Sequence, residues 1–332
     1  MYRILPIVLV MFGLGAGAAM AQKTMLRVAS FTPPRSINVT YALKPFVDRI
    51  NQAIGNEVIA QGYWGGSLGR NPRKYVDMVK GGLADIAIIV PGYTPGQFPG
   101  YSVFELPFIA RSALEGSLAE WRMFKTGLMK GWEPLKVVSL FSTEPNHFHT
   151  KKRIKSITDI DGMKIRIAGP VHGQTVKHYN GVPIGMPVTQ ATEALSRGVV
   201  DGVLLGFSGA GTFRIYSIAK FTYAAPLGIS PLAIIMNKKK WKSLSARAKA
   251  AIDNFGGETM ARDGGNGFDN TAARFRKKIA GTQKIIEASD SDVAQGFKFV
   301  QPVHQAWIKN NTNGQKIYDT YRKIVADIRA GR

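Results

Sequence analysis

Short apolar segments alternate with helical patterns over the first part of the chain. Residues 25–29, 57–62 and 85–90 are short and rich in apolar side chains, which predicts strands. Residues 38–54 carry apolar side chains at helical spacing, and residues 72–80 form a shorter helical pattern. This βαβαβ order predicts a parallel sheet with helices on both faces. Ligands of such sheets bind beyond the carboxyl ends of the strands.

A second series of the same kind follows the strand-like residues 137–141. We expect the chain to cross between two domains at Thr143-Glu144-Pro145-Asn146 and to return to the first domain at residues 233–237. The later elements are expected strands at 164–167, 183–186 and 202–205, helices at 174–179 and 189–197, and a long helical pattern over 245–280. We expect interruptions of that long helix at Gly256-Gly257 and Gly264-Gly265.

The N-terminus has the pattern of an export signal. An apolar run covers residues 4–21 and ends in Ala19-Met20-Ala21, which is an A-x-A cleavage pattern. We therefore interpret residues 1–21 as a signal peptide and expect the mature protein in the periplasm. An uncleaved membrane anchor is the alternative, because the run is barely long enough to cross a bilayer.

Charge and composition narrow the function classes. The formal net charge is +22, which suits nucleic acid, an acidic membrane surface or small anions as partners. The basic residues are scattered, and no nucleic-acid-binding motif accompanies them, so we expect no nucleic-acid partner. The chain has no cysteine, which excludes disulfides, thiolate metal sites and a cysteine nucleophile.

Glycine-rich segments at residues 62–69 and 206–211 do not match a phosphate-binding loop, and we interpret both as turns. The G-x-S-x-G elbow of hydrolases and the H-E-x-x-H zinc motif are absent from the sequence. We therefore expect a protein without catalytic residues, bound metal or cofactor.

Arg166 is the candidate with the clearest chemistry. On a strand over 164–167, Ile165 and Ile167 point to one face and Arg166 to the other. The strand ends at Gly169-Pro170, where the planar guanidinium can present its donors to a carboxylate. An internal ion pair or a solvated arginine remains the alternative.

A set of motifs gives the chain a family resemblance. Residues 156–169 (SITDIDGMKIRIAG), 181–188 (GVPIGMPV) and 193–202 (EALSRGVVDG) resemble the DctP-type periplasmic solute receptors of TRAP transporters. The same resemblance extends, in order and spacing, to residues 26–34 (LRVASFTPP), 63–69 (YWGGSLG), 81–87 (GGLADIA), 104–108 (FELPF) and 234–244 (IIMNKKKWKSL).

The resemblance implies an α/β fold of two lobes, that of periplasmic binding proteins. Each lobe would hold a mixed, mostly parallel sheet flanked by helices, with one long helix spanning both. Lobe I would comprise residues 22–145 and about 233–268, and lobe II residues 146–232 and about 269–310. Residues 311–332 would form a C-terminal helix on the lobes. We expect a monomer that delivers a small organic acid to a permease of small and large membrane subunits.

The resemblance also implies a binding site with Arg166 on the ligand carboxylate. Many relatives have an asparagine after G-V-V-D-G and a second arginine after the first crossing, whereas this chain has residues 203–207 (VLLGF) and 146–149 (NHFH). The loss of polar groups favours a monocarboxylate with an apolar or aromatic body. His147 is a candidate donor to the ligand, and the candidate walls are Phe31, Trp64, Tyr93, Phe148, Met186 and Phe207.

Two other functions remain open at this point. One is a solute receptor of another transport class with the same two-lobed architecture. The other is an exported metal-dependent hydrolase that would use His147 and His149, because both side chains of an H-x-H pair on a strand face the same side.

Overall fold

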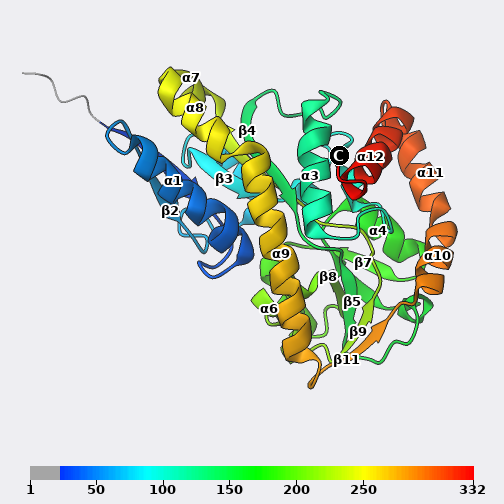
Figure 1. Ribbon diagram of the computed structural model, residues 1–332. Helices are drawn as coiled ribbons and strands as arrows, with labels where there is room; N and C mark the ends of the chain where they lie inside the picture. The colour runs from blue at the N-terminus through cyan, green and yellow to red at the C-terminus, as the bar shows by residue number, and fades with distance from the viewer. Residues whose placement is uncertain (1–22) are drawn as a thin grey trace, which may run out of the picture.

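The computed structural model describes residues 23–332, so the predicted signal peptide lies outside the described residues. The first of two sheets has the order β2-β1-β3-β10-β4 (Figure 1). Its strands are β1 (Thr24–Ala29), β2 (Val58–Tyr63), β3 (Ile86–Ile89), β4 (Leu135–Ser142) and β10 (Pro231–Asn237). Strand β1 is parallel to β2 and β3, whereas β10 is antiparallel to β3 and β4.

The second sheet has the order β11-β9-β5-β8-β6-β7. Strand β6 is parallel to β7 and β8, and β5 is antiparallel to β8 and β9. Two mixed sheets flanked by helices confirm the predicted fold class. The strands are β5 (His147–Thr150), β6 (Lys164–Ile167), β7 (Val182–Gly185), β8 (Gly202–Leu205), β9 (Phe221–Ala224) and β11 (Lys284–Glu287).

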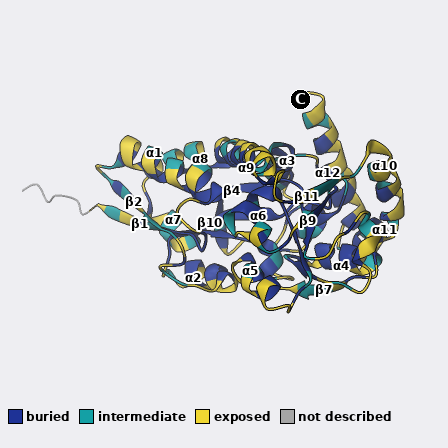
Figure 2. Cartoon of the chain, turned by 90° about the horizontal axis from the view of Figure 1, so that it is seen from below, coloured by how far each residue is buried: buried dark blue, intermediate teal, exposed yellow. Residues whose placement is uncertain are grey.

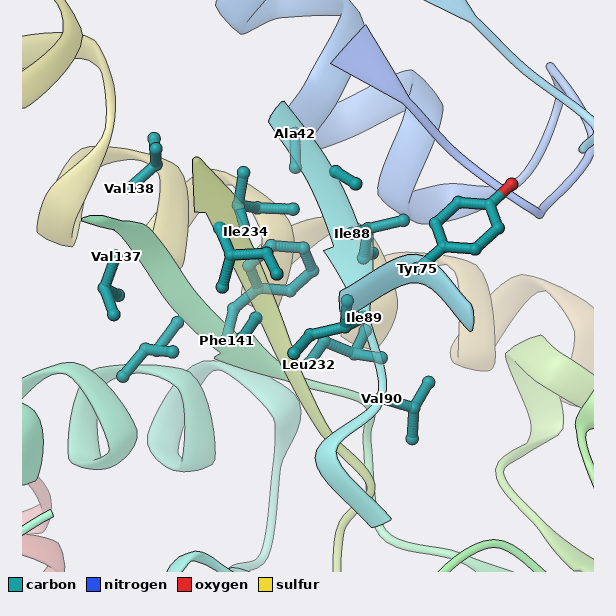
Figure 3. Close-up of a cluster of buried hydrophobic side chains, with 14 of the residues drawn as sticks. Ala42, Tyr75, Ile88, Ile89, Val90, Val137, Val138, Phe141, Leu232 and Ile234 are labelled. Atoms are coloured by element: carbon teal, nitrogen blue, oxygen red, sulfur yellow. The ribbon is translucent and has the colours of Figure 1, made fainter. Parts of the chain in front are cut away.

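The core of the first sheet explains its continuous apolar strands. Ile88 and Ile89 of β3 lie beside Leu232 and Ile234 of β10, and Phe141 of β4 packs next to them (Figure 3). Ile88, Ile234 and Phe141 have no exposed surface. Strands covered on both faces need apolar residues at successive positions, which is why these strands lack polar alternation.

Helices cover the two sheets, and the outer faces of these helices are exposed to solvent (Figure 2). The predicted helix over 38–54 begins as the π-helical segment η1 (Asn38–Leu43) and continues as α1 (Lys44–Ile54). The other helices are α2 (Tyr75–Lys80), α3 (Ala113–Lys125), α4 (Pro170–His178), α5 (Val188–Ser196), α6 (Phe207–Thr212), α7 (Lys238–Ser243), α8 (Ala246–Phe255), α9 (Gly257–Ile279), α10 (Asp290–Phe299), α11 (Gln301–Asn310) and α12 (Gly314–Arg329). Short 3₁₀ turns are η2 (Pro72–Lys74), η3 (Pro91–Tyr93), η4 (Tyr101–Glu105), η5 (Ile157–Ile160) and η6 (Ile215–Ser217).

The chain passes between the sheets at several points. Strand β4 belongs to the first sheet and β5 to the second, so residues 143–146 connect the two sheets. Strand β10 returns to the first sheet, and α9 then runs past both sheets toward β11 (Figure 1). The assignment of the other residues to lobes stays a prediction.

One of the two predicted interruptions of the long helix is wrong. The helix breaks at Gly256, where ψ is −137°, but α9 continues through Gly264 and Gly265. A Cβ on Gly265 would lie 2.7 Å from the Cα of Leu114, and one on Gly264 would lie 3.0 Å from the ring of Phe141. These glycines let α9 pack closely on α3 and β4, and they do not bend it.

The interpretation of residues 206–211 as a turn is also wrong, because Phe207–Thr212 forms helix α6. The carboxylate of Glu144 accepts hydrogen bonds from the Ser208 amide (2.7 Å) and hydroxyl (2.8 Å) at the start of this helix. A distant acceptor therefore satisfies the first turn of a short, glycine-rich helix, which local sequence does not reveal. Within residues 23–332, no helix has both the length and the apolar character needed to cross a membrane.

Candidate functional site

Arg166 lies on β6 at the junction of the two sheets. Its Nε and Nη2 both donate to the carbonyl oxygen of Met186, at 2.9 and 2.8 Å, and Nη2 also donates to the Tyr93 hydroxyl at 3.2 Å. Because Ile165 and Ile167 point into the core of the second sheet, the alternation of the strand turns Arg166 to the opposite face. The bonds to Met186 hold one edge of the guanidinium and thus fix its plane.

The burial of Arg166 is the most unusual electrostatic feature of the site. The residue is only 1% exposed, and no Asp or Glu among residues 23–332 forms an ion pair with it. Burial lowers the pKa of the guanidinium, although the hydroxyl of Tyr93 opposes this shift. A buried cation without a counterion is costly, so this position favours the binding of an external anion.

Tyr93 connects the first sheet to this arginine. It ends η3, the turn that follows β3, and its hydroxyl accepts hydrogen bonds from Arg166 Nη2 and from the Val188 amide at 2.9 Å. Arg166 and Val188 both belong to the side of the second sheet. One hydroxyl therefore joins the two halves of the molecule at the site.

A cavity of about 70 Å³ lies beside Arg166, between the two sheets. A cavity of this volume has room for a few water molecules. Arg166 is the one charged residue that the structure places in the cavity lining within residues 23–332. The lining comprises Phe31, Thr32, Ser36, Ile37, Asn38, Val90, Tyr93, Thr143, Arg166, Ala168, Val188, Leu205, Gly209, Thr212, Phe213, Ser230, Leu232 and Phe268.

Three of the predicted site residues line this cavity together. Phe31 follows β1, Tyr93 follows β3, and the centroids of their rings are 6.4 Å apart. Arg166 completes the group, because its guanidinium contacts the Tyr93 hydroxyl. Met186 contributes through its backbone carbonyl on Arg166, which is a different role from the predicted side-chain wall.

His147 and Phe207 line a different and larger hollow of about 980 Å³, which also contains Arg276. Their rings lie 4.7 Å apart, and His147 Nδ1 donates to the carbonyl oxygen of Ala225 at 2.9 Å. Burial lowers the pKa of His147 to about 4, so the ring is neutral near pH 7. The structure does not bring His147 and Phe207 to the cavity beside Arg166.

Phe148 and Trp64 also lie away from the Arg166 cavity. Phe148 has no exposed surface and packs in the core of the second sheet. Trp64 folds back over β2, where a Cβ on Gly62 would lie 2.0 Å from the indole ring. Both aromatic residues therefore pack in structural positions, although their sequence positions next to strand ends suggested a ligand wall.

Sequence reasoning missed the polar residues of the loop after β1 and an aromatic residue after α6. Thr32, Ser36 and Asn38 line the cavity from the side of the first sheet, and Phe213 lines it from the side of the second sheet. The signal in the sequence was the position of residues 32–38 directly beyond the carboxyl end of a parallel strand. Phe213 had no such signal, because α6 was not predicted.

The metal-dependent hydrolase considered from the sequence would need His149 as a metal ligand, and the structure engages that side chain otherwise. Nε2 of His149 donates to the carbonyl oxygen of Leu205 at 3.0 Å, and Nδ1 lies 2.9 Å from the Thr222 hydroxyl. Both nitrogens are thus engaged within the protein, and burial lowers the pKa of His149 to about 3. Over residues 23–332, no three His, Asp or Glu side chains gather as metal ligands.

Two buried glutamates lie where the sheets meet. Glu105 ends η4, and its Oε2 accepts from the Val171 amide at 2.9 Å at the start of α4. Burial raises the pKa of Glu105 to about 8 and that of Glu144 to about 7, while hydrogen bonds from backbone amides oppose both shifts. These carboxyls tie segments of one sheet to helices of the other.

Comparison with known proteins finds one protein family that matches most of the chain. The model of bacterial extracellular solute-binding protein family 7, DctP, matches residues 28–310. The outer membrane transporter protein TsaT of Comamonas testosteroni is 26% identical over 324 residues, covering 93% of this chain and 94% of TsaT.

Two similar solved structures contain aromatic acids. A marine metagenome TRAP solute-binding protein, described as specific for aromatic acid ligands, was crystallised with 3-hydroxybenzoate. It is 30% identical, with a TM-score of 0.87 and coverage of 92% of this chain and 98% of its own. A TRAP solute-binding protein of Rhodoferax ferrireducens, with copurified benzoate, is 25% identical, with a TM-score of 0.88 and coverage of 93% and 100%.

Proposed function

The chain belongs to the bacterial extracellular solute-binding proteins of family 7, and we propose that it is a TRAP receptor for aromatic monocarboxylates. The receptor binds the acid between the two sheets and presents it to a membrane permease. We assign it no catalytic step. Relatives of this family bind solutes for transport, and two similar structures contain benzoate or 3-hydroxybenzoate.

The observation that carries the proposal is the buried Arg166, which among residues 23–332 has no carboxylate partner and is the one charged residue of the cavity lining. A single guanidinium can bind one carboxylate through two parallel hydrogen bonds, and its charge is then neutralised in place. A second carboxylate would be buried without a partner, which is unfavourable. The cavity therefore supports a monocarboxylate over a dicarboxylate.

Aromatic rings supply the other half of the recognition. Phe31, Phe213 and Phe268 line the cavity together with aliphatic residues. Aromatic walls bury a large apolar area in a defined geometry, which suits a planar ring attached to the carboxylate. This combination of one cation and several rings supports benzoate-like acids as the ligand class.

Binding is coupled to closure of the two halves of the protein. Besides Tyr93, the exposed side chain of Arg73, which follows β2, donates to the carbonyl oxygen of Gly185 at the end of β7, at 3.2 Å. Contacts that exist only in the closed form let a ligand that bridges both halves shift the equilibrium toward it. The closed receptor is the species that a permease of small and large subunits recognises in the periplasm, and we propose that it works as a monomer.

A thermal-shift screen of the chain from Gln22 onward against organic acids tests the proposal. A ligand that binds only the folded protein raises its melting temperature by mass action. We expect a large shift with benzoate-like acids and little shift with succinate or glucuronate at the same concentration. A shift confined to dicarboxylates or sugar acids would overturn the aromatic-acid assignment, and the absence of any shift with folded protein would overturn the organic-acid receptor.

A further inference from the structure

The polar residues of the loop after β1 form a hydrogen-bonded cluster at the cavity wall. Thr32 Oγ1 lies 2.8 Å from Ser30 Oγ, 2.7 Å from Ser36 Oγ and 2.9 Å from Asn38 Nδ2. All four residues are buried, and three of them line the cavity beside Arg166. An apolar cavity therefore has one patch of hydroxyl and amide groups on the side of the first sheet.

The hydrogen-bonding capacity of this cluster is not fully used. A threonine hydroxyl has one donor and two acceptor positions, so its three neighbours saturate Thr32 Oγ1. An asparagine amide can form about four hydrogen bonds. Among residues 23–332, Thr32 is the one group that hydrogen-bonds the Asn38 amide, although Asn38 is only 4% exposed. Ser36 Oγ likewise has Thr32 as its one partner in that part of the chain.

The other polar groups of the cavity are occupied by the protein itself. Thr143 Oγ1 donates to the carbonyl of Glu144 and accepts from the Ser230 amide, at 2.8 and 3.1 Å. Thr212 Oγ1 donates to the carbonyl of Ser208 at 2.9 Å. Asn38 therefore stands apart, because among the described residues both polar atoms of its buried amide share the single partner Thr32 Oγ1, whereas buried polar groups normally have their own partners.

A series of contacts along the cavity lining relates Asn38 to Arg166. Arg166 contacts Tyr93, the ring of Tyr93 lies 6.4 Å from that of Phe31, and Phe31 precedes Thr32 in the chain. The lining thus passes from the cation, along aromatic rings, to the amide and hydroxyl cluster. Asn38 also begins a π-helical segment, a rare conformation that occurs often at functional sites.

We propose that Asn38, with Ser36, recognises a hydroxyl group on the ring of the ligand, so that the receptor prefers hydroxylated aromatic monocarboxylates over unsubstituted ones. This inference rests on the proposed function and names the ligand class more narrowly. The carboxylate binds Arg166, the ring lies against Phe31, and the ring hydroxyl completes the hydrogen bonds of the Asn38 amide. A benzoate without the hydroxyl leaves the buried Asn38 amide incompletely bonded.

Calorimetry with benzoate, 3-hydroxybenzoate and 4-hydroxybenzoate tests this proposal on the wild type and on Asn38→Leu. We expect the wild type to bind at least one hydroxybenzoate about tenfold more tightly than benzoate, which is the scale of one buried hydrogen bond. In Asn38→Leu the ratio of the two affinities should fall to about one, whereas the exposed Asn56→Leu should keep the wild-type ratio. Ser36→Ala, a milder change, should reduce the ratio even if Asn38→Leu fails to fold.

The outcomes separate this proposal from the function on which it rests. Equal or weaker binding of both hydroxybenzoates by the wild type would overturn the hydroxyl preference and leave an aromatic-acid receptor. A preference that survives in both Asn38→Leu and Ser36→Ala would overturn the role of these residues. Failure of folded wild-type protein to bind any of the three acids would overturn both proposals.

Discussion

The Tyr93 hydroxyl lies 3.2 Å from Arg166 Nη2, and this contact joins the two sheets at the candidate site. Tyr93 belongs to the turn after β3 in the first sheet, whereas Arg166 lies on β6 in the second. The same hydroxyl also accepts from the Val188 amide. The hydroxyl that contacts Arg166, the proposed carboxylate anchor, is thus also a contact between the two sheets.

Tyr93→Phe should weaken the binding of an aromatic acid about tenfold. The substitution keeps the ring but leaves the Val188 amide and one guanidinium donor without their acceptor, which costs about 1–3 kcal/mol in the closed form. Calorimetric titration with benzoate measures the effect. Tyr63→Phe is the matched control, because the Tyr63 hydroxyl donates to the exposed Gln61 side chain at 3.2 Å, away from the cavity. Equal affinities of Tyr93→Phe and wild type would contradict a role of this hydroxyl in closure.

Arg166→Ala should lower the affinity for benzoate at least roughly tenfold, because a charge-assisted hydrogen-bonded pair is lost. Arg166→Lys keeps the charge but lacks the planar fork, so we expect an affinity between those of Arg166→Ala and the wild type. Arg197→Ala removes an arginine whose side chain is 73% exposed and should bind as the wild type does. Retained folding is checked by circular dichroism, and an unchanged affinity of folded Arg166→Ala would exclude the anchor role.

The buried Glu105 predicts a pH dependence of stability. Its pKa is raised to about 8 in the folded protein by burial, from an ordinary value of 4.5. The folded state therefore holds a proton that the unfolded state releases, and this contribution to stability is complete below pH 4.5 and is lost as pH rises through 8. The slope from this group is at most about 1.4 kcal/mol per pH unit.

Buried histidines act in the opposite direction but in a lower pH range. The pKa of His172 is lowered to about 3 by burial, so its contribution is lost as pH falls below the ordinary value of 6.5. Urea unfolding between pH 7 and 8.5 therefore isolates the carboxyl effect. We expect stability to decrease over this range in the wild type and to decrease less in Glu105→Gln, where the smaller contribution of Glu144, whose pKa is raised to about 7, remains. The exposed Glu193→Gln should follow the wild type, and an equal slope in Glu105→Gln would refute the assignment.

The elements that the sequence predicted correctly are those whose pattern is set locally. Residues 164–167 form β6 as predicted, because apolar alternation and the Gly-Pro break act over a few residues. Helix α6 was missed because its first turn is completed by Glu144, which is 64 residues away in the chain. The break at Gly256 was foreseen, but the role of Gly265 depends on how closely α3 approaches α9.

At the candidate site, too, the sequence predicted some of the residues correctly and missed others. Phe31 and Tyr93 were predicted from strand ends, and Arg166 from its strand position together with the family resemblance. The structure brings the three residues to one cavity. His147 was expected beside them, but strand alternation turns it to the larger hollow with Phe207. Asn38 was not foreseen, although it lies in the segment that follows β1, and it begins the π-helical η1, which hydrophobic periodicity does not encode.

Alanine substitutions at two helical glycines, Gly265 in α9 and Gly173 in α4, should have opposite effects on stability. In Gly265→Ala the new Cβ would lie 2.7 Å from the Cα of Leu114, so the backbone of α3 must shift. Overpacking of this kind costs about 1–3 kcal/mol, which exceeds the gain of about 1 kcal/mol in helix propensity. Gly173 in α4 is the matched position, because the nearest atom to its Cβ would lie at an ordinary 3.7 Å.

We therefore expect Gly265→Ala to lower the free energy of unfolding and Gly173→Ala to raise it by up to about 1 kcal/mol. Urea unfolding at one fixed pH measures both against the wild type. Because α9 runs past both sheets, a shift of this helix should also alter how the two halves close on a ligand (Figure 1). Gly265→Ala should consequently bind benzoate more weakly, whereas a Gly265→Ala protein as stable as the wild type would show that the contact with α3 relaxes without cost.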